Sequence, residues 1–232
     1  MIKTQPVYDP LYLNKDKFII IITGGRGSGK SYNASTFLER LSFEAGHKIL
    51  FSRYTMVSAH NSIIPEFEEK IQAEGTQAYF SVTKTAIKNT FSGSEILFKG
   101  IKTSSGNQTA NLKSLHGITT FVGDEMEEWV DEESYKKLLY SIRQKDMQLR
   151  VILIMNPSNA EHFIYKKYIE QTHKVVMIDG VEVQISTHPD VLHIHTTYLD
   201  NIEYLNDIFL QQIKRLKEDS IAQATDEYGN FS

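Results

Sequence analysis

The sequence predicts an α/β fold in which a mostly parallel central sheet has helices on both faces and added antiparallel strands. Short apolar segments alternate with segments of helical periodicity, as parallel strands joined by crossover helices require. A glycine-rich loop, residues 23–31, joins the first apolar segment to the first helical one. An Asp-Gly pair at 179–180, inside a strand-like run, is typical of a β-hairpin.

Composition and charge narrow the class of protein. The chain has 232 residues, of which 41% are hydrophobic and 23% charged, which fits either one large globular domain or a domain with a small appendage. A formal net charge of -4 argues against a protein that coats nucleic acid by bulk charge. The absence of cysteine excludes disulfides, zinc-thiolate sites and thiol catalysis. The longest apolar run, 18–22, is too short to cross a bilayer, so we expect a soluble cytosolic protein without a membrane partner.

The first predicted elements surround the glycine-rich loop. Residues 18–22 predict a buried strand, and apolar residues at helical spacing follow the loop up to Gly46. A second strand at 48–53 and a second helix at about 62–73 come next. Three further strand-like segments lie close together, and we expect them to be antiparallel: 79–83, 87–91 and 95–99.

The second half of the chain alternates in the same way after a polar loop at 103–112. An apolar run at 118–123 leads directly into Asp124 and Glu125. The remaining expected elements are a helix at 135–142, a buried strand at 149–155, a short helix at 163–168, a hairpin at 175–183, a strand at 193–198 and a polar helix at about 203–218.

The glycine-rich loop matches the phosphate-loop pattern G-x-x-x-x-G-K-[ST], between a strand and a helix as the pattern requires. Glycines let backbone N–H groups turn inward around a polyphosphate, and the following helix adds the positive end of its dipole. Lys30 would bring a full charge to the β- and γ-phosphates, and the Ser31 hydroxyl is a ligand for Mg²⁺. The alternative is a loop that only turns a corner. The predicted nucleotide-binding residues are Gly24, Gly25, Arg26, Gly27, Ser28, Gly29, Lys30 and Ser31.

Asp124 and Glu125 are predicted to form the second half of the site. Ligands of open α/β sheets gather at the carboxyl ends of the strands, so Asp124 should lie beside the phosphate loop and hold Mg²⁺ together with Ser31. Glu125 would orient an attacking water or take its proton. Gly123 interrupts the apolar run before them, which weakens a strand unless backbone must approach closely there.

Two further polar residues have both a functional and a structural interpretation. The Arg26 guanidinium could reach the γ-phosphate and stabilise charge that develops during transfer; otherwise it pairs with a surface carboxylate. We favour the catalytic role. Asn156 ends the strand at 149–155 and could sense the γ-phosphate, or it could simply open a turn with Pro157. In the N-terminal arm, Tyr8 and Tyr12 could contact an adenine or pack the arm.

Three other groups of polar residues are less informative. The acidic cluster after Glu125 contains Glu127, Glu128 and a predicted helix start at 131–133, and we interpret it as a solvated surface. We interpret His188, His193 and His195 as a solvated strand face and not as a metal site. The least acidic stretch offers weak candidates for contacts with a DNA backbone: Lys84, Lys88, Lys99, Lys102 and Lys113.

Together these residues resemble the ATPase domain of phage terminase large subunits over about 18–201. The resemblance rests on the arginine-bearing phosphate loop, the segment from 49–53 through Phe67, and motifs that follow in the family's order. These motifs are Ser94-Glu95-Ile96-Leu97-Phe98-Lys99-Gly100, Lys113-Ser114-Leu115-His116-Gly117 before Asp124-Glu125, Asn156-Pro157 with Phe163-Ile164-Tyr165, and Thr197-Tyr198-Leu199-Asp200-Asn201.

The resemblance implies Mg²⁺-dependent ATP hydrolysis that drives double-stranded viral DNA into a procapsid. By this resemblance, Arg26 matches the arginine finger that family members supply within the same chain, and Glu125 matches their catalytic acid. Asn156 lies in the segment that couples hydrolysis to movement. Gly123 and Asn156-Pro157 depart from the family pattern. Implied partners are DNA, a portal protein, a small terminase subunit and other copies in a ring, with a monomer plausible in isolation. Implied location is the host cytoplasm, with transient docking on the procapsid.

The resemblance also implies a division of the chain. Residues 1–205 would form the ATPase domain with its N-terminal arm, and 206–232 a C-terminal helix or linker toward a nuclease domain. We expect that nuclease domain, and its cutting activity, to be absent from this chain.

Two other classes of function remain open. The first is a different phosphate-loop enzyme, such as a small-molecule kinase, a GTPase or a DNA-dependent ATPase that does not package. No Asn-Lys-x-Asp guanine motif or Arg-rich lid supports a GTPase or a kinase. The second is a structural module that binds a nucleotide without turnover, which a measurement of ATP hydrolysis would distinguish.

Overall fold

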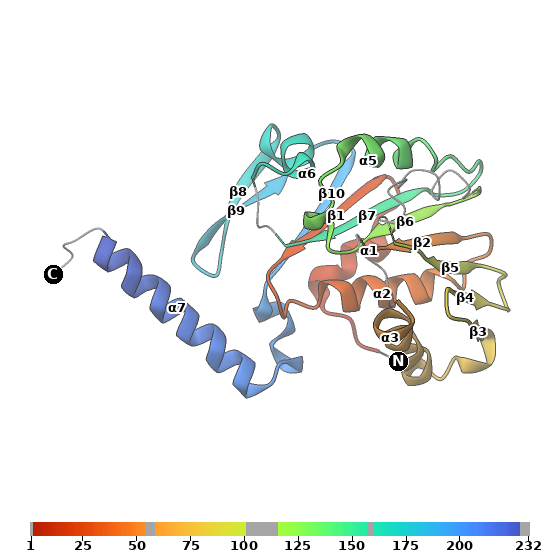
Figure 1. The fold of residues 1–232 in the computed structure, drawn as a ribbon, viewed down its shortest axis with the longest axis horizontal. Helices are drawn as coiled ribbons and strands as arrows, with labels where there is room; N and C mark the ends of the chain where they lie inside the picture. Colours follow the sequence, from red (N-terminus) through yellow and green to blue (C-terminus); the bar gives the residue numbers. More distant parts are fainter. Residues whose placement is uncertain (1, 54–58, 101–115, 157–159, 228–232) are drawn as a thin grey trace.

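The computed structural model describes residues 2–53, 59–100, 116–156 and 160–227. Its centre is an eight-stranded sheet with the order β10-β1-β7-β6-β2-β5-β4-β3 (Figure 1). The strands from β10 to β5 in this order are parallel, and β4 and β3 are antiparallel, which confirms the predicted fold class. The strands are β1 Ile19–Gly24, β2 Lys48–Ser52, β3 Phe80–Val82, β4 Ala86–Asn89, β5 Glu95–Phe98, β6 Thr120–Gly123, β7 Arg150–Met155 and β10 Val191–Thr196.

Helices cover both faces of the sheet, and each face buries alternate residues of the central strands (Figure 1). Ile20 and Ile22 of β1 belong to the core shared with α1, α2 and α3, whereas Ile19 and Ile21 belong to the core shared with α5 and α6. These fully apolar strands therefore require cover on two sides. The helices and helical turns of this part are η1 Pro6–Tyr8, α1 Asp9–Leu13, α2 Lys30–Leu41, α3 Ala59–Glu74, η2 Gln77–Tyr79, η3 Met126–Glu128, α5 Glu132–Leu139, α6 Phe163–Tyr165 and the π-helical turn η4 Lys166–Glu170.

The predicted hairpin is present as β8 His173–Ile178 and β9 Val181–Ser186, which form a separate two-stranded sheet. Asp179 and Gly180 both have positive φ, 53° and 77°. Two such residues make the turn whose twist fits a tight hairpin. The Asp-Gly signal in the sequence therefore marked the turn correctly.

The last elements differ in their bounds from those expected. The final strand ends at Thr196 because Thr197 begins the helical turn η5 Tyr198–Tyr204 with a reciprocal capping arrangement. Helix α7 then runs over Asp207–Glu227 and projects away from the sheet (Figure 1). It starts later than expected because Asn206 caps it: the Asn206 side chain accepts a 2.8 Å hydrogen bond from the Phe209 amide.

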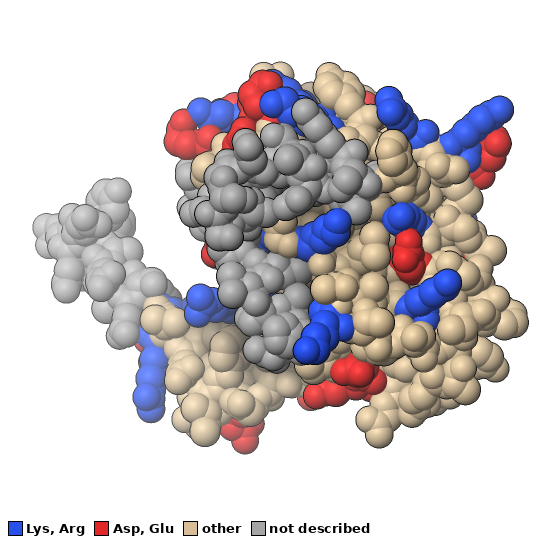
Figure 2. Space-filling view, turned by 45° about the vertical axis from the view of Figure 1, so that its right-hand side comes forward, with Lys and Arg blue, Asp and Glu red and all other residues tan. Residues whose placement is uncertain are grey.

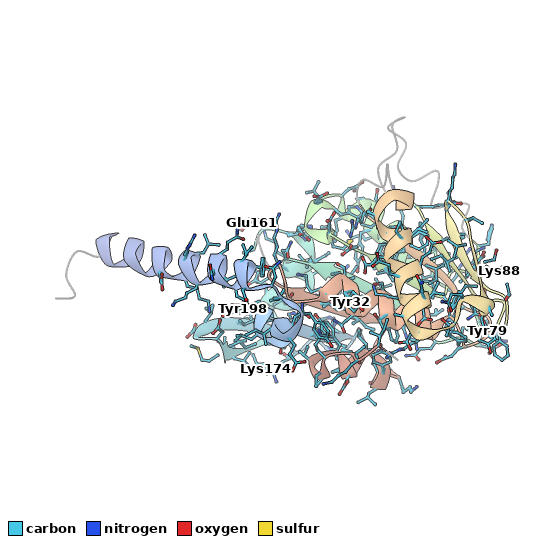
Figure 3. All side chains as sticks on the ribbon, turned by 90° about the horizontal axis from the view of Figure 1, so that it is seen from below. Tyr32, Tyr79, Lys88, Glu161, Lys174 and Tyr198 are labelled. Carbon is cyan, nitrogen blue, oxygen red and sulfur yellow. The ribbon has the colours of Figure 1, made fainter. Side chains whose placement is uncertain are left out.

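The predicted DNA-contact lysines that the structure describes lie on or beside β3, β4 and β5, the strands at the side of the sheet away from β1. Lys88 is on β4, at the end of the molecule opposite α7 (Figure 3). Lys84 and Lys99 flank the same antiparallel strands, whereas Lys102 and Lys113 lie outside the described residues. On the face shown in Figure 2, the Lys and Arg side chains are scattered, and several of them lie beside Asp or Glu. None of the helices in the described ranges is long and apolar enough to cross a membrane.

Candidate nucleotide-binding site

The phosphate loop joins β1 to α2 as predicted. Gly27 and Gly29 have φ of 78° and 80°, the left-handed region where a side chain is unfavourable. Gly24 is required for a different reason, since a Cβ there would lie 2.1 Å from the Thr196 backbone oxygen on β10. The loop is thus folded tightly against its neighbouring strand, with the start of α2 at Lys30.

Lys30 lies folded over this loop. Its Nζ donates hydrogen bonds of 2.7 Å to the Gly24 carbonyl, 2.9 Å to the Gly25 carbonyl and 3.1 Å to Asn156 Oδ1. Burial lowers the pKa of Lys30, and the nearby carboxylates Glu127 and Asp124 oppose that change. The ammonium group is therefore held at the centre of the site by oxygen atoms that an anionic ligand can replace.

Ser31 and Asp124 meet directly beside Lys30. The Ser31 hydroxyl donates a 2.8 Å hydrogen bond to Asp124 Oδ1, and Asp124 is almost fully buried. Its other oxygen accepts hydrogen bonds of 2.8 and 2.6 Å from Arg53 at the end of β2. A hydroxyl next to a carboxylate is a donor set that suits Mg²⁺. Arg53 thereby compensates the buried charge of Asp124, a role that no motif in the sequence predicts.

Glu125 follows Asp124 but faces a different environment. Its φ of 57° is left-handed, and its side chain is exposed, whereas that of Asp124 is buried. Burial of the carboxyl raises the pKa of Glu125, while Arg53, with the closest N–O distance at 4.0 Å, lowers it. A carboxylate with a raised pKa at the open side of the site is suited to accept a proton from water.

The absence of a side chain at Gly123 leaves space for Met126 next to these carboxylates. A Cβ at Gly123 would lie 2.2 Å from the Met126 sulfur, and Met126 is fully buried. The close approach that the sequence suggested at this glycine is therefore real, although a side chain and not the backbone makes it. The packed Met126 fixes the turn η3 that carries the next acidic residues.

Asn156 is held between Lys30 and Glu127. Its Nδ2 donates a 2.5 Å hydrogen bond to Glu127 Oε1, and its backbone amide donates a 3.2 Å bond to Glu127 Oε2. The interpretation of Glu127 as part of a solvated acidic surface is wrong, because η3 folds it back into the site. Pro157, the expected turn residue, lies outside the described residues. Asn156 and Glu127 line a cavity of about 240 Å³. Its other polar lining residues are Arg26, Lys30, Ser31, Asp124, Glu125 and Glu128.

Arg26 also borders a second, larger space. It lines both the small cavity and a groove of about 840 Å³ that extends between the hairpin and α7. The Arg26 side chain is exposed. It can therefore reach the site without breaking a buried contact. Across the groove, Lys217 of α7 pairs with Asp179 of the hairpin turn and donates a 3.1 Å hydrogen bond to the hydroxyl of Tyr198, which lies at the base of α7 (Figure 3).

The outer side of the loop is held by residues from both ends of the chain. The Tyr8 hydroxyl donates a 2.8 Å hydrogen bond to the Ser28 carbonyl, and Asn201 Nδ2 donates one of 2.8 Å to the Gly27 carbonyl. Tyr8 is fully buried, so the N-terminal arm packs on the loop and Tyr8 is not available for a base. The Phe209 ring covers Gly27, where a Cβ would lie 2.5 Å from the ring.

The interpretation of His193 and His195 as a solvated strand face is wrong. His193 Nε2 and His195 Nδ1 lie 2.7 and 2.8 Å from Thr23 Oγ1, and both residues are half-buried at the wall of the large groove. His188 lies apart, and its ring accepts a 3.2 Å hydrogen bond from the Asp190 amide. The parallel register that pairs Thr23 with His195 produces this arrangement.

Comparison with known proteins identifies the family. A model of the phage terminase large subunit family matches residues 16–228. The chain belongs to this family. One relative is the PBSX phage terminase large subunit of Bacillus subtilis (strain 168), 26% identical over 219 residues that make up 92% of this chain and 49% of the relative. The resemblance inferred from the order of the motifs is confirmed.

Solved terminase structures share the fold at low sequence identity. A large terminase from a thermophilic bacteriophage has a TM-score of 0.64 at 16% identity, over 90% of this chain and 46% of that one. The ATPase domain of the Thermus phage P74-26 large terminase has a TM-score of 0.54 at 16% identity, over 90% and 92%. The N-terminal domain of the bacteriophage phi29 DNA packaging ATPase has a TM-score of 0.54 at 14% identity, over 81% and 97%. This chain spans about half the length of the PBSX terminase and of the thermophilic bacteriophage terminase.

Proposed function

We propose that this chain binds ATP with Mg²⁺ and hydrolyses it, and that hydrolysis drives double-stranded viral DNA into a procapsid. The observation that carries the proposal is the set of groups around one cavity at the carboxyl ends of β1, β6 and β7. Lys30, the hydrogen-bonded pair Ser31 and Asp124, and Glu125 all line it. These are the groups that phosphoryl transfer to water requires.

The binding of the nucleotide follows from the loop. Its backbone N–H groups and the start of α2 would hold the β- and γ-phosphates, and Lys30 would exchange its carbonyl partners for phosphate oxygens. Ser31 and Asp124 would hold Mg²⁺, which neutralises charge on the phosphates. A second structure of the thermophilic bacteriophage terminase, with a TM-score of 0.61 to this chain, is a complex with ADP, which supports nucleotide binding by this chain.

The chemical step uses residues on the open side of the cavity. Glu125, whose pKa is raised, would orient the attacking water and accept its proton. Arg26 would stabilise the negative charge that develops as the γ-phosphate leaves. Asn156 already contacts Lys30 and Glu127, so the loss of a γ-phosphate would change its partners. We propose that this change starts the movement that follows hydrolysis.

The proposal extends to assembly and organisation. Family membership supports DNA, a portal protein, a small terminase subunit and a ring of identical copies as partners, with the site working in the host cytoplasm on a docked procapsid. The proposed division into an ATPase domain, 1–205, and a C-terminal helix, 206–232, places α7 at the boundary. α7 begins at Asp207, directly after the Asn206 cap.

The test is ATP hydrolysis measured with and without linear duplex DNA, over a series of salt and protein concentrations. Stimulation by DNA that weakens as salt rises is expected, because phosphate contacts release counterions. Activity per subunit should rise with protein concentration if neighbouring copies complete the site. Hydrolysis that responds neither to DNA nor to protein concentration contradicts a motor function. Nucleotide binding without turnover would instead support the structural module.

A further inference from the structure

Thr23, His193 and His195 form a partly buried cluster at the wall of the large groove, and neither nucleotide binding nor hydrolysis, as proposed above, uses it. Thr23 is the last side chain of β1 before the glycines of the phosphate loop, and only 3% of it is exposed. Its hydroxyl is the meeting point of two imidazole rings, at 2.7 Å from His193 Nε2 and 2.8 Å from His195 Nδ1.

The hydrogen-bonding pattern fixes the proton on each ring. The Ser186 backbone amide of β9 donates a 2.9 Å hydrogen bond to His193 Nδ1, so the neutral His193 ring carries its proton on Nε2 and donates it to Thr23. Among the described residues the Thr23 hydroxyl proton has one remaining acceptor, His195 Nδ1. His195 therefore carries its own proton on Nε2.

The environment keeps both rings in this neutral form. Burial lowers the pKa of His193 to about 4, and the neighbouring His195 acts in the same direction. Burial also lowers the pKa of His195, where Asp200 opposes the change and the positive charge of Lys30 adds to it. The chain of hydrogen bonds, from Ser186 through His193 and Thr23 to His195, is thus intact at neutral pH.

This chain of hydrogen bonds ends next to the groups that hold Lys30. The two peptides after Thr23 belong to Gly24 and Gly25, whose carbonyl oxygens accept the hydrogen bonds from Lys30 Nζ. A rotation of the end of β1 would therefore displace both acceptors at once. Backbone pairing holds Gly24 on the β10 side only, because the pairing of β1 with β7 ends at Thr23.

We propose that Thr23, held by His193 and His195, is a positioning residue for nucleotide binding, and that the same hydrogen bonds tie the β8–β9 hairpin to the phosphate loop. This inference rests on the proposed ATP site. Thr23 acts through the backbone of Gly24 and Gly25 and touches no phosphate. Its removal should therefore weaken binding of the nucleotide more than it slows the chemical step.

The test compares Thr23→Val with Thr23→Ser and with a matched control, Thr120→Val. Thr120 is also a fully buried strand threonine, on β6, but its hydroxyl has no hydrogen-bond partner among the described residues. Dissociation constants for Mg-ADP and kcat at saturating ATP are measured for each variant well below its melting temperature. Thr23→Val should weaken ADP binding about tenfold and change kcat by less than about threefold. Thr23→Ser and Thr120→Val should stay within about twofold of the unchanged chain.

Two further measurements make the outcome decisive. Long-range ¹⁵N–¹H spectra of the unchanged chain should show both rings protonated at Nε2; a proton on His195 Nδ1 would overturn the hydrogen-bond chain even if nucleotide binds. If Thr23→Val does not fold, His195→Asn, whose amide oxygen replaces the Nδ1 acceptor, should bind ADP better than His195→Leu. ADP binding by Thr23→Val equal to that of the unchanged chain, or equal binding by the two His195 variants, contradicts the proposal. Failure of the unchanged chain to bind ADP would instead refute the ATP site itself.

Discussion

Ser31 and Asp124 are 93 residues apart in the sequence, yet the Ser31 hydroxyl donates a 2.8 Å hydrogen bond to Asp124 Oδ1. Ser31 lies in the first turn of α2, after the phosphate loop, and Asp124 directly follows β6 at the same edge of the sheet. The parallel arrangement of β1, β7 and β6 brings the two ends together. This contact places the proposed Mg²⁺ ligands beside Lys30 before any nucleotide arrives.

Glu125→Gln should abolish most ATP hydrolysis and leave nucleotide binding nearly unchanged. Glutamine keeps the size of the side chain and cannot accept a proton, so kcat should fall by about 10²–10⁴-fold. The measurement is steady-state hydrolysis together with the dissociation constant for Mg-ADP. Turnover equal to that of the unchanged chain would refute the role given to Glu125.

Glu127→Ala should impair hydrolysis through Asn156. Without Glu127 the Asn156 Nδ2 group and backbone amide lose the acceptors at 2.5 and 3.2 Å, and kcat should fall by about tenfold as Asn156 leaves Lys30. Glu133→Ala is the control, because Glu133 is an exposed glutamate in the first turn of α5 that pairs with Lys136 and does not line the cavity. Equal rates for the two variants would show that Glu127 is only part of a solvated surface.

Gly27→Ala should destabilise the fold more than Gly25→Ala. Gly27 combines a φ of 78° with the Phe209 ring 2.5 Å from a Cβ, whereas a Cβ at Gly25 meets nothing within 4 Å. We expect a loss of about 2–4 kcal/mol at Gly27 and less than about 1 kcal/mol at Gly25, measured by urea unfolding.

A double variant separates the two causes at Gly27. Gly27→Ala with Phe209→Ala should be less destabilised than the sum of the two single variants, because the clash is absent. Additive losses would mean that only the backbone conformation, and not the Phe209 ring, disfavours a side chain at this position.

Stability should fall as the solution is acidified below pH 6.5. The pKa of His193 is about 4 in the folded chain and 6.5 as its ordinary value. As the pH falls, His193 therefore takes up a proton in the unfolded chain before it does so in the folded chain. The contribution of neutral His193 to the free energy of unfolding is complete above about pH 6.5 and is lost toward pH 4. At pH 5 the loss is of the order of 2 kcal/mol, measurable by urea unfolding at several pH values. His193→Gln should flatten this dependence, and an identical slope in that variant would contradict the assignment.

Much of the fold could be predicted because its signals are local. The phosphate loop, the Asp179-Gly180 turn and the apolar strands each depend on residues within a few positions of one another. The positions of Asp124 and Asn156 near the loop followed from one general rule, that parallel strands place their carboxyl ends at one edge. The bounds of β10 and α7 were less accurate because the caps at Thr197 and Asn206 decide them.

Local patterns were enough to predict most strands, the phosphate loop and the residues that could hold a phosphate and a metal ion, because strand and turn preferences act over short distances. The partners of those residues depend on how the strands are ordered in the folded chain. Arg53 reaches Asp124, and Glu127 reaches Asn156, through the order of the strands and one tight turn. Likewise Thr23 meets His195 through the register between β1 and β10, which was not evident from either strand alone.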